Sequence, residues 1–176
     1  MSPNRETSIR DRIDHSTART CVGNAARWAD YFYILVAARN QEGSSAFRDA
    51  ISFVFSVYSN PSTVGGSGVI AAIQQLEDRW AQDSSLDDAA VFSVRVCRFA
   101  AEAALAFLKG DDFAVRSATM SAAKCALRAA DEGLTPSACL EVQSMIVGND
   151  GADKNLTYAE VEIPVPIAGA LRNQWA

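Results

Sequence analysis

The residue types that could perform hydrolysis occur together once in this chain, at Asp14, His15 and Ser16, and His15 is the single histidine. A catalytic triad needs these three side chains to converge from separate positions in the fold, which neighbours in sequence do not achieve by themselves. We therefore expect His15 to be a solvated side chain. With one histidine, histidine-dependent hydrolysis and metal sites built from two histidines are both disfavoured.

Two further segments have the composition of ligand-binding loops but lack the required spacing. Residues 65–68 (Gly-Gly-Ser-Gly) precede a helical pattern and could offer backbone N–H groups to an anion, but neither nucleotide-binding glycine motif is present. Residues 150–162 fail as a calcium loop, because Ala152 and Lys154 occupy ligand positions and Asn155 replaces the required glycine. We expect a flexible loop at 65–68 and no calcium site.

The four cysteines, at positions 21, 97, 125 and 139, form neither a CxxC pair nor a cluster with histidine. Zinc sites need such clusters, so none is predicted. Cys97 and Cys125 lie in alanine-rich apolar patterns, where a reduced thiol behaves as a small apolar side chain. The sequence predicts no catalytic, cofactor-binding or metal-binding residue.

Acidic residues are concentrated between positions 77 and 88. This segment holds five carboxylates and one arginine, a net charge of −4. It is either a solvated face or a docking surface for a basic protein, where charge speeds encounter and fixes orientation. The predicted partner-binding residues are Glu77, Asp78, Asp83, Asp87 and Asp88.

The pairs Asp87/Asp88 and Asp111/Asp112 are also expected to begin helices, with Ser85 as the N-cap of the first, because acids are favoured at the positive end of the helix dipole. A polar stripe at Arg95, Arg98 and Glu102 has helical spacing. It is either an exposed face with internal ion pairs or, if buried, a specific polar site.

The element that must position most of these residues is a helix at residues 86–108. Its polar residues cover one narrow arc and the rest of its circumference is apolar, as in a helix surrounded by others. Gly110 is expected to end it, and a short connection to a helix at 113–130 makes the two an antiparallel hairpin. Ala118, Ala122 and Ala126 give the second helix a small-residue stripe that allows close approach.

Further helices are predicted at residues 17–40, 69–80 and 135–147. Residues 47–58 fit both a strand and a helix, and the helical surroundings favour the helix. Residues 1–15 are expected to form a flexible N-terminal tail and residues 149–176 an irregular, extended C-terminal arm. The predicted fold class is all-α, a single bundle of five to six helices with its domain at residues 16–148.

Composition limits the function classes. The 176-residue chain has a net charge of −5 and a pI near 4.9, which disfavours binding to nucleic acid or to an anionic membrane. The polar N-terminus does not have the pattern of a secretory signal, and the longest uncharged stretch is broken by Pro61 and by the glycines at 65–68. We expect a cytoplasmic protein without a transmembrane helix.

The hairpin at residues 98–130, with its runs Ala-Ala-Glu-Ala-Ala-Leu-Ala and Ala-Lys-Cys-Ala-Leu-Arg-Ala-Ala, resembles the alanine-rich helical hairpins of bacterial polymorphic-toxin immunity proteins. The resemblance covers about a quarter of the chain and carries over no functional residue. It implies a non-enzymatic protein that neutralises a toxin by occluding it.

Three functional hypotheses follow. The first is a non-enzymatic, protein-interaction module, an immunity or antitoxin-like inhibitor of a basic toxin. The second is a helical ligand-binding or regulatory domain with a pocket lined by Trp28, Tyr31, Phe32 and Tyr33. The third is an enzyme that works without histidine. A basic protein partner would support the first hypothesis. A small molecule that co-purifies with the protein would support the second, and turnover that is lost when one carboxylate is changed would support the third.

Overall fold

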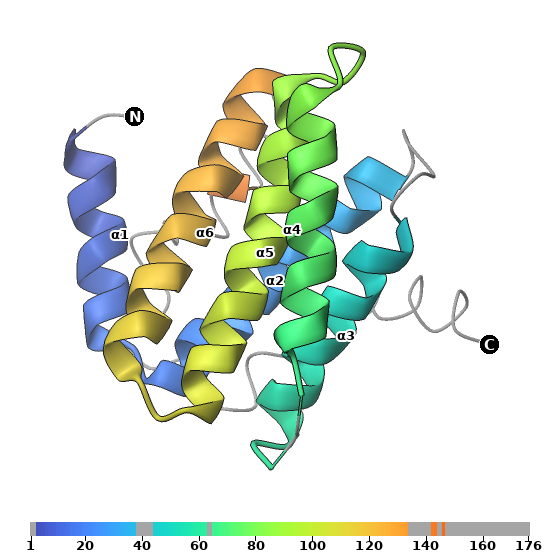
Figure 1. Ribbon diagram of the computed structural model, residues 1–176. Coiled ribbons are helices and arrows are strands. Elements are labelled where there is room, and N and C mark those ends of the chain that lie inside the picture. Colours follow the sequence, from blue (N-terminus) through green and yellow to red (C-terminus); the bar gives the residue numbers. More distant parts are fainter. Residues whose placement is uncertain (1–2, 38–43, 63–64, 134–141, 144–145, 147–176) are drawn as a thin grey trace.

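The fold is seen in a computed structural model that describes residues 3–37, 44–62, 65–133, 142–143 and 146. These residues form packed helices and no strand, which confirms the all-α class (Figure 1). The predicted C-terminal arm at 149–176 and most of the predicted helix at 135–147 lie outside the described residues. Within these described ranges the helices are α1 (Pro3–His15), α2 (Ala18–Ala37), α3 (Ser44–Ser59), α4 (Ser67–Gln82), α5 (Asp88–Leu108) and α6 (Asp112–Gly133).

Helix α5 is the centre of the bundle, as its nearly continuous apolar circumference predicts. It packs against α2, α3, α4 and α6, and α6 is its most extensive neighbour. Buried positions occur all around the helix rather than along one stripe. Among them are Val94, Cys97, Ala101 and Ala104, each with no exposed surface.

The α5–α6 hairpin forms as expected. Gly110 has φ of +71°, a left-handed conformation that glycine adopts without steric cost. The N–H groups of Gly110 and Asp111 donate to the carbonyl oxygens of Phe107 and Ala106, which close the end of α5. Ala122 and Ala126 of α6 are fully buried, so small side chains line the interface between these two helices.

The ambiguous residues 47–58 belong to a helix, α3. Phe47, Ile51, Val54 and Tyr58 follow helical spacing, and the first three are almost completely buried. The alternating aromatic and β-branched residues had also suggested a strand. Because the described neighbours of α3 are α2, α4 and α5, all helices, the backbone of α3 satisfies its own hydrogen bonds.

A flexible tail was predicted at residues 1–15, and this is wrong for residues 3–15, the part that the structure describes. Residues 3–15 form α1, which packs against α6. Ile9 and Ile13 are 1% and 6% exposed, and their spacing of four places both on one face of an otherwise polar helix. Arg116 of α6 donates to the carbonyl oxygens of Ile13 and Asp14 at the end of α1. The domain therefore does not begin at residue 16.

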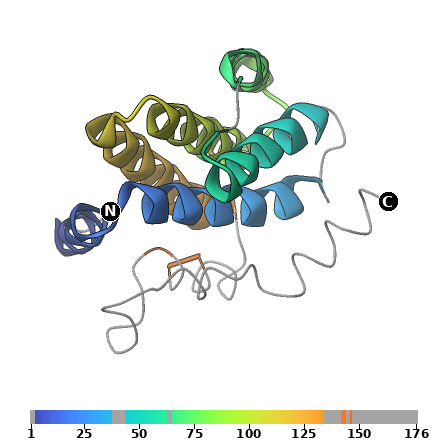
Figure 2. The same cartoon turned by 90° about the horizontal axis from the view of Figure 1, so that it is seen from below.

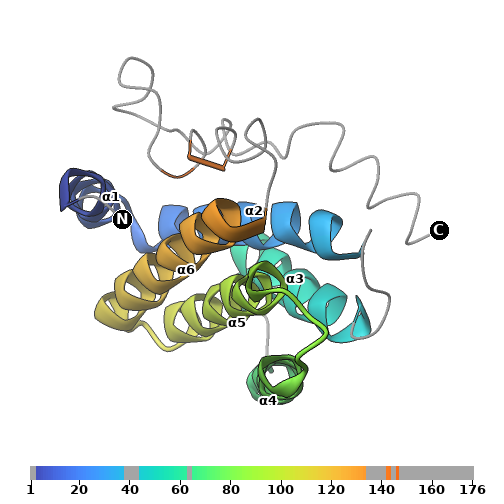
Figure 3. The ribbon, with the colours of Figure 1, turned by 90° about the horizontal axis from the view of Figure 1, so that it is seen from above.

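The helices are arranged so that α1 and α4 lie at opposite edges. Figures 2 and 3 show α2 crossing one side of the α5–α6 pair, α4 outside α3 and α5, and α1 beyond α6. None of the helices in the described ranges combines the length and the apolar character needed to cross a bilayer.

Candidate functional site

The five predicted partner-binding carboxylates divide into two groups. Asp78 is exposed on α4, Asp83 follows the end of α4, and Asp87 and Asp88 are exposed at the start of α5. We call these four residues the acidic corner. Glu77, in contrast, is 8% exposed and points into the interface between α4 and α5.

Local hydrogen bonds fix the geometry of the acidic corner. The N–H and hydroxyl of Ser85 donate to Oδ1 of Asp83 at 2.9 and 2.6 Å. Both bonds hold the pKa of Asp83 below its ordinary value, and the bond from the hydroxyl has the larger effect. Asp87 accepts a hydrogen bond from the N–H of Ala90 at 2.8 Å, and its extended backbone makes it the N-cap of α5.

Ser85 was predicted to be that N-cap, and this is wrong. The chain makes a turn in which the N–H of Leu86 bonds to the carbonyl oxygen of Asp83. The turn directs the Ser85 hydroxyl back to Asp83 and leaves Asp87 to accept from the N–H of Ala90 in the first turn of α5. Asp83 and Asp87 therefore have defined positions on a short, hydrogen-bonded connection between α4 and α5.

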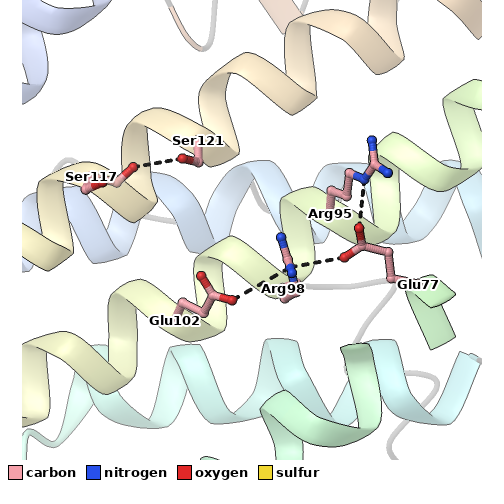
Figure 4. A network of polar contacts seen from close by, with 6 residues as sticks. All are labelled: Glu77, Arg95, Arg98, Glu102, Ser117 and Ser121. Carbon is pink, nitrogen blue, oxygen red and sulfur yellow. Dashed lines mark hydrogen bonds and ion pairs between the residues drawn. The ribbon is translucent and has the colours of Figure 1, made fainter. Parts of the chain in front are cut away.

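Behind the corner lies an ion-pair cluster of Glu77, Arg95, Arg98 and Glu102 (Figure 4). Nε of Arg95 is 2.8 Å from Oε1 of Glu77, and Nε of Arg98 is 3.0 Å from its Oε2. Nε of Arg98 also lies 3.7 Å from Oε1 of Glu102, one turn further along α5. Two guanidinium groups thus face the Glu77 carboxylate. Its negative charge is balanced inside the protein by Arg95 and Arg98.

The cluster is partly buried. The side chains of Glu77 and Arg98 are 11% and 18% exposed, while those of Arg95 and Glu102 are about one-third exposed. Burial raises the pKa of Glu102, and the charge of Arg98 opposes that rise. Of the two interpretations of the Arg95, Arg98 and Glu102 stripe, the structure supports a specific polar contact between α4 and α5 rather than an exposed face.

Cys125 of α6 lies near this cluster and is half-buried. Burial raises the pKa of its thiol to about 11, although the charge of Arg95 acts in the opposite direction. Cys21 and Cys97 are buried, and burial raises their pKa values also. These thiols are protonated near neutral pH, where a thiol is a poor nucleophile and metal ligand.

The aromatic residues suggested to line a ligand pocket are instead part of the core. Trp28, Phe32 and Tyr33 are 4%, 1% and 7% exposed, and Tyr31 packs edge-on to Phe32. The rings of Tyr33 and Phe47 lie 6.1 Å apart, centroid to centroid, which ties α2 to α3. These side chains stabilise the fold.

The other sequence candidates serve local structure. His15 Nδ1 lies 2.6 Å from the carbonyl oxygen of Asp11, and the Ser16 hydroxyl donates to that of Arg12, so neither faces the other as a triad requires. Gly66 has φ of +112° and lies against the ring of Phe53, where a Cβ atom would clash. Within the described ranges, no three or more His, Cys, Asp or Glu side chains are grouped to hold a metal ion.

One concave surface was not anticipated. It lies between α1 and α6 and combines Arg10, Arg116 and Lys124 with the exposed ring of Phe113. The pair Ile9 and Ile13 was the sequence signal that could have revealed it, because two isoleucines four residues apart in a polar segment indicate a helix with one buried face.

Comparison with known proteins adds no assignment: no protein-family model, curated protein or solved structure matches this chain.

Proposed function

We propose that this protein is a non-enzymatic interaction module that binds a basic surface of a partner protein through its acidic corner. We further propose that it acts in the cytoplasm as an immunity or antitoxin-like inhibitor of a basic toxin. The observation that carries the proposal is the exposure of Asp78, Asp83, Asp87 and Asp88 around the connection between α4 and α5, where local hydrogen bonds position Asp83 and Asp87.

Two physical features support this role. Carboxylates that share one surface attract a basic partner protein from a distance and orient it before contact. The corner is also held by local hydrogen bonds and connects two helices that the Glu77 ion pairs join. Such a rigid surface loses little conformational entropy when it binds.

The first test is growth rescue. The chain is expressed together with the product of a neighbouring gene that is toxic when expressed alone. Restored growth, with a stoichiometric complex recovered on purification, supports the proposal. Continued killing at equal expression of the two proteins would contradict it.

The second test assigns the surface. We would compare the triple variant Asp78→Asn, Asp83→Asn, Asp88→Asn with a control in which Asp11→Asn, Asp49→Asn and Glu132→Gln remove three exposed charges elsewhere. Both variants have the same net charge. The corner variant should lower the association rate constant for the toxin about tenfold or more at low salt, with a weaker salt dependence than the control. Equal rates for the two variants would place the interface elsewhere.

A further inference from the structure

The groove between α1 and α6 is distinct from the acidic corner in both position and charge. It has a volume of about 350 Å³ and is lined by residues of α1 and α6. Figure 3 shows that α1 lies beyond α6, on the edge of the bundle away from α4. Three cationic side chains, Arg10, Arg116 and Lys124, line it together with one carboxylate, that of Asp14. Glu6, which pairs with Lys124 and Arg10, adds a second carboxylate beside these groups, so their net charge is +1 on a chain whose total charge is −5.

Contacts between the helices fix where these cations lie. Nζ of Lys124 is 2.5 Å from Oε1 of Glu6, and Arg10 pairs with the same carboxylate at 3.7 Å. Arg116 donates to the carbonyl oxygens that end α1. Two cations from α6 and one from α1 are thereby held on the two sides of one groove.

The groove also has an apolar part. Phe113, in the first turn of α6, is 84% exposed, the highest exposure of a large apolar side chain in the described ranges. Met120, two turns further along α6, is half-buried and lines the groove with Ile13. Covering Phe113 would remove a large apolar surface from water, which is favourable for binding.

The spacing of these features suits an extended peptide. The segment from Phe113 to Lys124 spans about 16 Å along the helix axis, at 1.5 Å per residue. About five residues of an extended chain cover that length. Successive side chains of an extended chain alternate between its two faces, so in a segment that alternates acidic and aliphatic residues the aliphatic side chains share the face that covers Phe113 and Met120. The carboxylates lie on the other face, within reach of the long side chains of Arg10 and Lys124, which are 61% and 44% exposed.

We propose that the α1–α6 groove binds a short, extended segment of another protein in which acidic and aliphatic residues alternate. The aliphatic side chains cover Phe113 and Met120, and the carboxylates pair with Lys124, Arg10 and Arg116. This site goes beyond the proposed function, since its partner has the opposite charge and lies on another face of the molecule.

The probe is the acetylated and amidated pentapeptide Glu-Val-Glu-Ile-Glu, titrated into the full, isotope-labelled chain and followed by amide chemical shifts. Saturable shifts confined to α1 and α6 are expected. The peptides Gln-Val-Gln-Ile-Gln, which lacks charge, and Glu-Ser-Glu-Ser-Glu, which lacks apolar groups, should bind at least about threefold and tenfold more weakly. No saturable binding of the first peptide, or equal binding of all three, would overturn the proposal.

Variants of the groove sharpen the test. Phe113→Ser should weaken binding about tenfold and leave the fold intact, because this side chain is already exposed. Lys124→Gln should weaken binding about threefold, against the matched control Lys109→Gln, which changes an exposed lysine outside the groove. If Lys124→Gln disturbs the packing of α1, the affinity measured for Phe113→Ser decides whether the peptide binds in this groove. Unchanged affinity in Phe113→Ser would exclude this groove.

Two other occupants have their own signatures. If peptide binding appears only after Glu160→Gln and Glu162→Gln, the chain's own acidic and aliphatic segment competes for the groove, and an external partner is wrong. If the mass in sedimentation rises with concentration, and the rise is abolished by both Phe113→Ser and the acidic-corner triple variant, the occupant is a second copy. Peptide binding by the corner variant with wild-type affinity would separate this groove from the proposed function.

Discussion

Two buried carboxyl groups, Asp30 of α2 and Glu77 of α4, are accommodated in different ways. Asp30 is 1% exposed, and its Oδ1 has no hydrogen-bond partner in the described part of the chain. Burial raises the pKa of Asp30 to about 7. Glu77 is 8% exposed, and its Oε1 accepts a hydrogen bond from Nε of Arg95 at 2.8 Å. Its Oε2 accepts no hydrogen bond from the described residues but forms an ion pair with Nε of Arg98 at 3.0 Å.

The two residues show two ways to lower the free-energy cost of burying a carboxylate. Moving a carboxylate from water into a protein is unfavourable unless the charge is paired or lost by protonation. Glu77 has partners because α4 lies over a stretch of α5 that carries arginines. Asp30 instead faces the core, where its charge helps burial to raise the pKa of Cys97. Protonation is the route open to Asp30, so its cost depends on pH.

The largest effect on stability is expected from a new buried carboxylate that has no cationic partner. Ala104→Asp would place a carboxyl at a fully buried position on the central helix α5. We expect the free energy of unfolding to fall by roughly 4 kcal/mol or more, measured by urea denaturation. The control Ala72→Asp, on the exposed face of α4, should cost less than about 1 kcal/mol. A variant at position 104 that melts like the parent would show that α5 is not central.

The second prediction is a pH dependence that Asp30 causes. Its pKa in the folded state, about 7, exceeds the ordinary value of 3.8, so the folded state binds the proton more tightly than the unfolded state. The favourable contribution is complete below pH 3.8 and is lost as pH rises through 7. Between pH 5 and pH 8, stability should fall by roughly 2–3 kcal/mol through this group.

Asp30→Asn isolates that contribution. An amide does not titrate, so the variant should be more stable than the parent at pH 8 by about 2 kcal/mol and gain less at pH 5. Urea denaturation at both pH values measures the difference. The control Asp49→Asn changes an exposed carboxylate of α3 and should keep the parent's profile. Parallel pH profiles for the parent and Asp30→Asn would contradict the assignment.

The third prediction removes the paired carboxylate. Glu77→Ala leaves Arg95 partly buried without this carboxylate and leaves Arg98 with only the longer contact to Glu102, and it should destabilise the protein by roughly 2 kcal/mol. The double variant Glu77→Leu, Arg98→Met replaces one buried pair with apolar groups, and its stability should lie within about 1 kcal/mol of the parent. Thermal melts at pH 7 compare the two. A double variant less stable than Glu77→Ala would mean that the pair is itself strongly favourable.

The smallest effect is expected at the acidic corner. Each of the substitutions Asp78→Asn, Asp83→Asn and Asp88→Asn changes an exposed side chain. In Asp83→Asn, the amide keeps an oxygen that accepts from Ser85. The free energy of unfolding should change by less than about 0.5 kcal/mol for each substitution. A larger loss, seen in urea denaturation, would mean that the corner is structural and would weaken the case for a binding surface.

Much of the fold could be predicted from short segments of the sequence. The apolar circumference of residues 86–108 predicts a surrounded helix, and Gly110 with Asp111 marks the hairpin, because these signals depend on neighbours in sequence. Helix α1 was missed, since two isoleucines among polar residues give a weak periodic signal. It packs through contacts with Arg116 and Lys124, more than one hundred residues away.

The candidate sites show the same division. The sequence by itself determined which residues are acidic, that two helices form a hairpin with its turn at Gly110, and that the helix before the turn is enclosed by others. Only the tertiary structure decided that Glu77 is paired inside while Asp78 stays in water, and that Asp30 is buried with one oxygen unpaired among the described residues. The physical reason is that a charge's environment depends on side chains from other helices, whose approach the local pattern does not encode.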